Sequence, residues 1–316
     1  MESTERRLLE IRLMHQFTTA TVSKDFLSLH DHNIFEMWMT TAPNLAFEFP
    51  FLLNTILSIA ALHLAKIQPE RQDMANIHRN YFNAAISQHR RAVRDMSTQN
   101  VEAVCISTVL IALPAFTLLQ NTEVGTYSPP LQLFYLLAGN IPLFRKALPL
   151  CGKNSKIRHI ITAKPNMATF IEEARKEVYR QPFDHFIGWR APGEEIDQES
   201  QAAYNFTLSF IGCILANIEK GEDSFVIRRI IYSFPTLAPP MFVTRLKERN
   251  HRALTILAYY FSLAKAVDNV WWMRGIAERE VLGIQSLLPE HWQWAMTWPL
   301  QKPASYTVSI TPQMAA

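Results

Sequence analysis

The chain has 316 residues, of which 48% are hydrophobic and 19% are charged, and its formal net charge is +3. This composition is typical of a globular protein, and it lacks the strongly basic character of a nucleic-acid-binding surface. The 9 glycines are few beside 18 prolines, and alternating Val, Ile and Thr are scarce, so few tight hairpins can form. We therefore expect a mostly helical protein.

The cysteines and the N-terminus indicate the compartment. Cys105, Cys151 and Cys213 are isolated from one another, and a sparse, odd set without metal-ligand spacing fits a reducing environment. The opening "MESTERRLLE" is charged and lacks the apolar core of a signal peptide. We expect a cytoplasmic or nuclear protein with no metal, no cofactor and no membrane span.

The first half of the chain predicts helices separated by polar turns. Residues 5–18 form an amphipathic helix, residues 31–33 a turn, and the next helical pieces break at Pro43 and Pro50. Longer helices are predicted at 51–67, 72–98, 101–119 and 131–147. The first of these, "FLLNTILSIAALHLAKI", is apolar on nearly every side, which is typical of a core helix. We expect a loop at 121–130 and a flexible polar insert at 151–166.

The second half continues the helical pattern. Gly221 ends one helix, and the prolines at 235, 239 and 240 separate two short ones. The segment 181–197 is expected to be irregular. Helices are predicted at 167–179, 198–220, 225–233, 240–249, 251–273, 276–287 and 290–298. The fold class is therefore all-α, a single compact multi-helix domain over residues 1–302 with an internal apolar pocket and an irregular C-terminal tail, 303–316.

Catalytic motifs are scarce. Neither a glycine-rich phosphate loop nor a G-x-S-x-G turn is present. "HDH" at 30–32 has no partner pair, so a solvated turn is favoured over a metal site. "HRRAVR" at 89–94 reads as a solvated helix face. Glu194 and Glu195 are adjacent and diverge, which favours a solvated loop over paired catalytic carboxylates.

The helix at 101–119 carries Pro114, which lacks an N–H and clashes with the preceding turn, so the helix is expected to kink or end there. One interpretation is a packing kink whose hydroxyls satisfy themselves. The other is a bent wall that opens space for a ligand, with Thr108 and Phe116 facing it.

The stretch "AYYFSLAKAVDNVWWMRG" (258–275) raises the same pair of interpretations. Tyr260, Ala264, Asp268 and Trp272 are spaced by four and would share one helix face, which Phe261 and Trp271 overlap. A carboxylate buried there needs a partner, such as Arg274, a tyrosine hydroxyl or a helix N-terminus. The stripe is either ordinary core or one wall of a deep apolar pocket. The candidate ligand-binding residues are Thr108, Phe116, Tyr204, Phe210, Tyr260, Phe261, Ala264, Asp268, Trp271 and Trp272, and the catalytic residues are unknown.

An ordered set of segments resembles a known family. These segments are "NLAFEFPFLLNTILSIAALHLA" (44–65), "YFNAAISQHRRAV" (81–93), "RALTILAYYFSLAKAVDNVWWMRG" (252–275) and "LLPEHWQWAMTWP" (287–299). Together they resemble the C-terminal regulatory domain of fungal zinc-cluster transcription factors of the sterol uptake control type. The resemblance implies an all-helical domain that binds a hydrophobic polycyclic ligand, ergosterol in the sterol regulators, and whose ligand state controls localisation and activation.

One departure from the family concerns DNA. The family places a zinc cluster of six cysteines ahead of this domain, whereas this chain has three distant cysteines, so the resemblance implies no direct nucleic-acid binding here. The leading hypothesis is a regulator-like domain that binds a sterol-like or terpenoid molecule, with a homodimer or a regulatory protein partner left open. The alternatives are a cofactor-free cyclase, isomerase or pericyclase of fungal secondary metabolism, which would fold a polyene in an apolar cavity, and a structural interaction protein.

Overall fold

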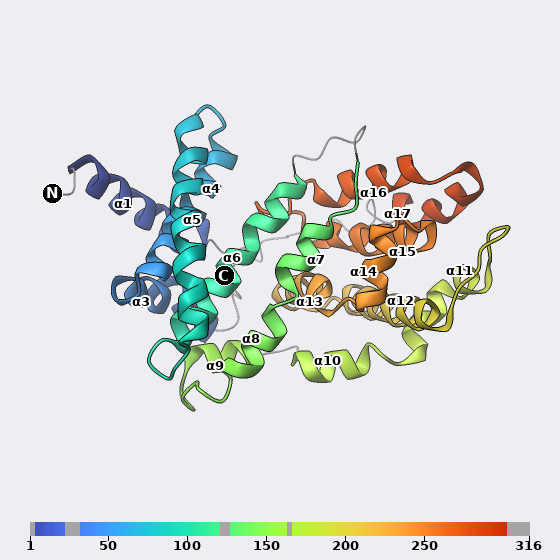
Figure 1. Cartoon of the computed structure of the whole chain (residues 1–316), viewed down its shortest axis with the longest axis horizontal. Helices are drawn as coiled ribbons and strands as arrows, with labels where there is room; N and C mark the ends of the chain where they lie inside the picture. Colours follow the sequence, from blue (N-terminus) through green and yellow to red (C-terminus); the bar gives the residue numbers. More distant parts are fainter. Residues whose placement is uncertain (1–3, 23–31, 121–126, 163–165, 302–316) are drawn as a thin grey trace, which may run out of the picture. The chain divides into compact units, whose positions relative to one another are not determined.

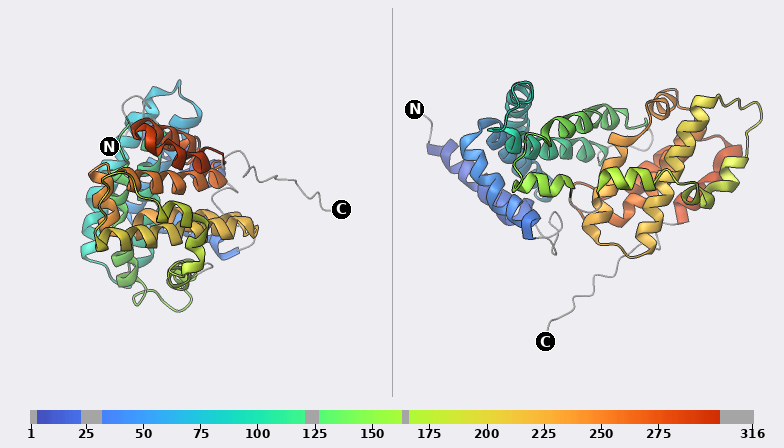
Figure 2. Two further views of the ribbon diagram at one scale, coloured as in Figure 1. Left: turned by 90° about the vertical axis from the view of Figure 1, so that its right-hand side faces the viewer. Right: turned by 90° about the horizontal axis from the view of Figure 1, so that it is seen from below.

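The computed structural model describes residues 4–22, 32–120, 127–162 and 166–301, and these residues form helices joined by turns and loops without any strand (Figure 1). Two further views show the same helical architecture (Figure 2). The predicted all-α fold is confirmed. Most of the predicted loop at 121–130, and the tail at 303–316, lie outside the described residues.

The chain divides into two compact units. Unit 1 comprises Met1–Leu118, Gln132–Met167 and the short return Val270–Trp272. Unit 2 comprises Leu119–Leu131, Ala168–Asn269 and Met273–Ala316.

Unit 1 is built chiefly from the N-terminal helices, two of which continue as π-helical turns. They are α1 (Thr4–Gln16), η1 (Phe17–Thr21), α2 (His32–Glu36), η2 (Met37–Thr41), α3 (Ala42–Glu48), α4 (Pro50–Ile67), α5 (Gln72–Arg94), α6 (Val101–Leu119), α7 (Leu131–Leu137), α8 (Asn140–Ala147) and α9 (Lys156–Thr162).

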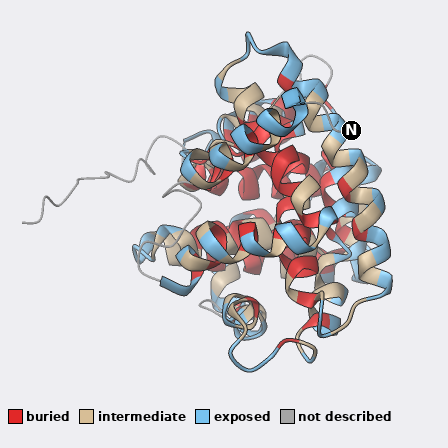
Figure 3. Cartoon of the chain, turned by 90° about the vertical axis from the view of Figure 1, so that its left-hand side faces the viewer, coloured by how far each residue is buried: buried red, intermediate tan, exposed pale blue. Residues whose placement is uncertain are grey.

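The core of unit 1 is formed by its most apolar helices. α4 and α6 are long and apolar enough to cross a bilayer, but 61% and 72% of their apolar windows are buried inside the protein. α5 packs beside α4 and is amphipathic, with exposed residues along its outer side (Figure 3). Burial of this kind is what a core helix requires, because each buried aliphatic side chain contributes about 1.5–3 kcal/mol.

Hydroxyl and imidazole groups cross-link these three helices inside unit 1. Thr55 on α4 contacts Ser107 on α6 at 2.9 Å between hydroxyl oxygens, and Ser58 contacts His78 Nδ1 on α5 at 2.8 Å. The Thr108 hydroxyl donates its one hydrogen to Val104 O (2.8 Å), so it accepts from His89 Nε2 (3.2 Å). His89 Nδ1 is then a buried acceptor without a hydrogen-bond partner among the described residues.

These buried imidazoles predict an acid-sensitive unit 1. Burial lowers the pKa of His63 and of His89 from 6.5 to about 4. The unfolded chain therefore binds more protons between pH 6.5 and pH 4, and stability falls as the pH falls through that window. Between pH 7 and pH 5.5 the loss is about 1 kcal/mol per histidine.

Urea unfolding followed by circular dichroism at both pH values measures this loss. His89→Gln keeps a donor for Thr108 and is expected to remove about 1 kcal/mol of the pH dependence, whereas His15→Gln, at an exposed position on α1, leaves it unchanged. Equal pH dependence in His89→Gln and wild type contradicts the prediction.

Unit 2 is built from the C-terminal helices. They are α10 (Met167–Glu173), η4 (Glu177–Phe183), α11 (Asp184–Gly188), α12 (Gln198–Glu219), α13 (Ser224–Leu237), α14 (Pro240–Lys247), α15 (His251–Ala264), η5 (Lys265–Val267), α16 (Ile276–Leu287), η6 (Glu290–Met296) and α17 (Thr297–Gln301).

Local sequence signals define the ends of the longest helices in unit 2. Asp197, Asp223 and Asn250 are N-cap residues whose side chains accept backbone N–H groups of α12, α13 and α15. Gly221 follows α12 with φ +70°, which confirms it as the predicted stop. These caps fix the starts of α12, α13 and α15.

Two close approaches in unit 2 depend on glycine. A Cβ at position 212 on α12 would lie 1.7 Å from the carbonyl oxygen of Tyr179, so only glycine lets η4 pack this closely. A Cβ at position 283 on α16 would lie 2.2 Å from the Tyr127 ring. That ring reaches Glu280 one turn earlier on the same helix, where the Tyr127 hydroxyl donates to Glu280 Oε2 at 2.8 Å.

Of the two outcomes predicted at Pro114, a kink or an end, the helix does not end there, and Pro235 lies inside a helix where the sequence predicted a break. α6 continues past Pro114 to Leu119, and α13 continues past Pro235 to Leu237. Pro costs about 3 kcal/mol in a helix interior, but Leu110, Phe116 and Phe234 around these sites are buried. Their tertiary packing therefore outweighs the local penalty.

The predicted flexible insert at 151–166 is wrong for its central part, which forms α9. Ile157 is buried, and Arg158 Nη2 donates to the carbonyl oxygens of Leu148 (2.9 Å) and Cys151 (3.2 Å). These contacts give a polar segment a fixed place in unit 1. The predicted helix at 131–147 is divided at Gly139 into α7 and α8.

Candidate ligand-binding groove

Four of the ten predicted ligand-binding residues lie in unit 1. Thr108 and Phe116 are buried on α6, and Trp272 is buried in the Val270–Trp272 return. Trp271 stacks on His63 of α4, with ring centroids 4.7 Å apart and planes 22° apart. The aromatic stripe predicted near residue 271 therefore packs against α4 rather than extending α15.

Five others lie on α12 and α15 of unit 2, two helices that pack against each other. Tyr204 donates from its hydroxyl to Asn250 Oδ1 at 3.0 Å, and Tyr260 donates to Ile231 O at 3.0 Å. The other three, Phe210, Phe261 and Ala264, are at most 1% exposed. All five are firmly held in the core of unit 2.

Asp268 does not share a helix face with Tyr260 and Trp272, because α15 ends at Ala264. The predicted helix at 251–273 is wrong beyond that residue. Asp268 Oδ2 pairs with Lys265 Nζ at 2.9 Å, and its Oδ1 accepts the N–H of Gly275 at 2.7 Å. An aspartate that binds backbone ahead of it competes with helix continuation. Gly275 is the N-cap of α16, so the predicted helix N-terminus is the partner of this carboxylate.

A groove of about 640 Å³ runs along α12 in unit 2. This volume lies within the range of small-molecule sites. Its lining combines apolar side chains with two arginines and one glutamate and comprises Arg175, Arg180, Glu199, Ala202, Ala203, Asn205, Phe206, Ser209, Leu237, Pro239, Pro240 and Met241. None of the ten predicted residues is among them.

The floor of the groove connects to the predicted aromatic residues through ring contacts. Phe206 lies 6.3 Å from Phe210, which lies 5.6 Å from Phe234, and Phe234 lies 4.2 Å from Tyr260. A ligand resting on Phe206 would therefore rest on a rigid aromatic stack that crosses from α12 to α15. The predicted Phe210 and Tyr260 support the groove from behind.

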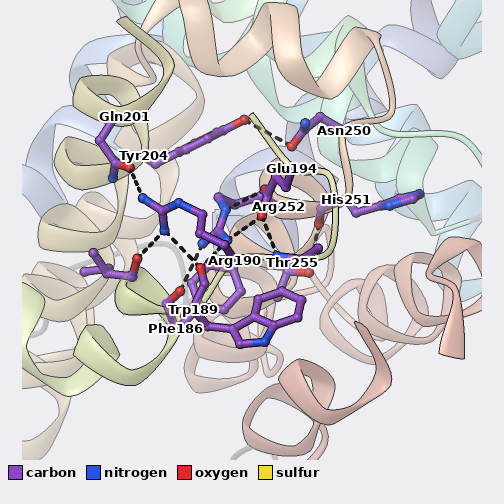
Figure 4. Close-up of polar contacts among 12 residues, drawn as sticks. Phe186, Trp189, Arg190, Glu194, Gln201, Tyr204, Asn250, His251, Arg252 and Thr255 are labelled. Atoms are coloured by element: carbon purple, nitrogen blue, oxygen red, sulfur yellow. Dashed lines mark hydrogen bonds and ion pairs between the residues drawn. The ribbon is translucent and has the colours of Figure 1, made fainter. Parts of the chain in front are cut away.

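A buried ion pair fixes the loop that precedes α12. Arg252 on α15 is 2% exposed and binds Glu194 in a bidentate manner, with Nε–Oε1 2.8 Å and Nη2–Oε2 2.7 Å (Figure 4). The same guanidinium donates to the carbonyl oxygens of Phe186 (3.0 Å) and Trp189 (2.7 Å). The predicted solvated loop is thus wrong for Glu194.

The surroundings of this pair explain its charge state. The guanidinium carbon of Arg252 lies 4.9 Å from the Phe186 ring, 5.9 Å from Trp189 and 5.5 Å from Trp292, in cation–π geometry. Burial alone raises the pKa of Glu194, but the bonds from Arg252 and the Ala191 N–H outweigh it, and the pKa lies below its usual value. Glu194 is therefore held as the anionic partner of Arg252.

A second hollow of about 290 Å³ lies beside this pair in unit 2. It is lined by Ala191, Pro192, Gly193, Glu194, Asn250, His251, His291 and Trp292. Its volume falls just below the usual small-molecule range, and the groove along α12 is the larger of these two hollows.

The metal-ligating residue types are dispersed in the described part of the chain. No group of three or more His, Cys, Asp or Glu side chains there could hold a metal ion. His30 and Asp31 of the "HDH" cluster lie outside the described residues, and His32 is exposed at the start of α2. The lining of the groove offers apolar side chains and two arginines.

The groove residues Phe206, Leu237 and Arg175 were missed in the sequence. Phe206 lies on a helix whose other aromatic residues, Tyr204 and Phe210, were selected. The proline-rich turn after Leu237 and the charged segment around Arg175 carry no signal that they meet on α12. Only tertiary contacts bring them together.

Comparison with known proteins relates the chain to fungal regulators. Residues 12–127 match the fungal specific transcription factor domain. The chain is 28% identical, over 80% of its length, to the Zn(2)-C6 fungal-type transcription factor afumD of Aspergillus fumigatus. It is 26% identical, over 93% of its length, to a Zn(2)-C6 fungal-type transcription factor of Gibberella zeae. The predicted resemblance to fungal zinc-cluster transcription factors is confirmed.

The sterol regulators are also among the relatives. Sterol uptake control protein 2 of Saccharomyces cerevisiae is 22% identical over 86% of this chain. The aligned part covers 66% of the Aspergillus protein, 62% of the Gibberella protein and 29% of the yeast protein. The chain therefore spans less than two thirds of the length of each of these relatives.

Proposed function

We propose that this chain is a regulatory ligand-binding region of the fungal zinc-cluster type, which binds a hydrophobic polycyclic molecule of the sterol or terpenoid class. The relatives support a regulatory role and a location in the nucleus or cytoplasm. The observation that carries the ligand proposal is the groove along α12, which has ligand-sized volume and an apolar floor.

The geometry of the floor favours a rigid, flat ligand. Phe206, Leu237 and Met241 are each partly exposed in the groove, so a ligand would remove their apolar surface from water. Burial of apolar surface contributes about 25 cal/mol per Å². A rigid polycyclic ligand loses little conformational entropy on binding, and more of this gain remains as affinity.

Binding of dehydroergosterol, a fluorescent sterol, tests the proposal by anisotropy titration. We expect saturable one-to-one binding to wild-type protein. Ala202 lines the groove and is exposed. The tryptophan of Ala202→Trp would therefore occupy the groove and not be forced into the core. This variant should weaken binding by roughly tenfold or more, which corresponds to about 1.4 kcal/mol.

Ala216→Trp is the matched control, because Ala216 lies on the same helix but does not line the groove. It should bind like wild type. Absence of saturable binding, or equal affinity of Ala202→Trp and wild type, contradicts the proposal. A cofactor-free cyclase stays a prediction from the sequence with no structural observation in its favour.

A further inference from the structure

We infer that the groove along α12 selects a polycyclic terpenoid that carries a carboxylate, which Arg175 and Arg180 bind at the rim while the ring system lies on Phe206, Leu237 and Met241. This inference rests on the proposed function, and it names the chemical class of the ligand.

Arg175 supplies a cation with free bonding capacity. Its side chain is exposed, and its guanidinium carbon lies 5.8 Å from the Phe206 ring centroid on the groove floor. The described part of the chain places no carboxylate within ion-pair distance of Arg175. By contrast, Arg180 forms an ion pair with Glu177, and Arg245 forms one with Asp197. The guanidinium therefore lies beside an aromatic side chain of the groove lining, and its N–H groups are available to an anion.

Arg180 is a second, partly compensated cation among the lining residues of the groove. Its Nη2 pairs with Glu177, which is largely exposed. A guanidinium has five N–H donors in a planar fork, so the pair with Glu177 leaves donors for a second carboxylate. Two guanidinium groups around one carboxylate match its two oxygens and four lone-pair directions.

The acidic lining residue lies away from this position. Glu199 is in the first turn of α12 and Phe206 follows seven residues later, which corresponds to about 10 Å along a helix axis. A carboxylate beside Arg175 and Phe206 is therefore separated from Glu199 by about a Debye length at moderate salt. The charge along the groove is polarised, so a ligand with an acidic group at one end has one preferred orientation.

Two matched ligands, abietic acid and abietinol, test this inference. They share one diterpenoid skeleton, but abietic acid carries a carboxylate where abietinol carries a hydroxyl. Isothermal titration calorimetry of the full chain at pH 7.5 should show about tenfold or stronger preference for the acid, because charge-assisted bonds to arginine are stronger than neutral ones. Arg175→Gln should remove most of the preference and leave affinity for the alcohol unchanged. Lys247→Gln, an exposed cation on α14 outside the groove, should behave like wild type.

Equal affinity of wild type for the acid and the alcohol overturns the inference, and so does an acid preference that survives in Arg175→Gln. Wild-type protein that binds dehydroergosterol but neither abietane also overturns it, while the proposed function stands. Protein that binds none of the three overturns the proposed function as well. A preference that weakens between 50 mM and 500 mM salt supports an ionic contact at the rim.

Discussion

Arg252→Met is expected to destabilise unit 2 by about 3–5 kcal/mol, because it leaves the Glu194 carboxylate buried without its cation. Methionine keeps the apolar stem but supplies none of the four recorded hydrogen bonds to Glu194, Phe186 and Trp189. The Arg252 side chain is only 2% exposed and the Glu194 side chain 11% exposed, so most of the pair is shielded from water. Such a loss is large against typical protein stability.

Tryptophan fluorescence during urea unfolding measures this effect in unit 2. Trp189 and Trp292 lie around Arg252, so their emission reports on this region. Glu194→Gln in the Arg252→Met background removes the stranded charge and should recover part of the loss.

Arg245→Met is the matched control. Arg245 also bridges two acidic groups, Asp197 and Glu248, but its side chain is 28% exposed. An exposed pair contributes about 0–1 kcal/mol, so this variant should remain near wild-type stability. Equal losses for Arg252→Met and Arg245→Met would contradict the structural role assigned to burial.

Glu280→Gln is expected to stabilise unit 2 at high pH. The difference in unfolding free energy between the variant and wild type should be about 3 kcal/mol larger at pH 8 than at pH 5. Burial raises the pKa of Glu280 from 4.5 to about 8, and the bond from Tyr127 and the charge of Arg279 only partly oppose it. The folded carboxyl therefore holds a proton that the unfolded chain has lost. Stability from this group is present below pH 4.5 and is lost as the pH rises through 8.

A glutamine side chain does not ionise in this pH range, and its amide oxygen can still accept the hydrogen bond from the Tyr127 hydroxyl. The difference in unfolding free energy between variant and wild type should be small near pH 5 and grow steadily to pH 8. Measuring variant and wild type at each pH cancels the opposite dependence that the buried histidines of unit 1 contribute. Thermal unfolding by calorimetry at pH 5, 6, 7 and 8 provides the data.

Glu278→Gln, two residues earlier on α16 and exposed, is the matched control and should show no such growth. If the difference in unfolding free energy between Glu280→Gln and wild type did not change with pH, Glu280 would be ionised in the folded protein at neutral pH, contrary to the prediction. That outcome would require a cation beside Glu280 stronger than Arg279.

The sequence predicted the helical segments well where one helix face is apolar or where a cap is present. α4, α5, α6, α12 and α16 fall where the periodicity placed them, and Gly221 ends α12 as predicted. These signals are local, since periodicity and caps act over a few residues. The resemblance to fungal regulators also came from ordered segments and needed no coordinates.

The errors arise where distant contacts override local preference. α13 continues through Pro235 to Leu237, because buried neighbours such as Phe234 hold it. α15 ends at Ala264, because Asp268 binds Lys265 and the Gly275 N–H instead of extending the helix. Neither outcome can be read from helix periodicity, because the competing energies come from residues outside the helix.

The candidate site shows the same division. The sequence by itself determined that this protein is helical and rich in aromatic residues, and it placed candidate residues on helices at 101–119, 198–220 and 251–273. Only the tertiary structure decided which side chains face a hollow: it placed Phe210 and Tyr260 in the core and brought Phe206 together with Arg175 and Leu237. The reason is physical, because exposure depends on which other elements cover a side chain, and coverage is a property of the whole fold.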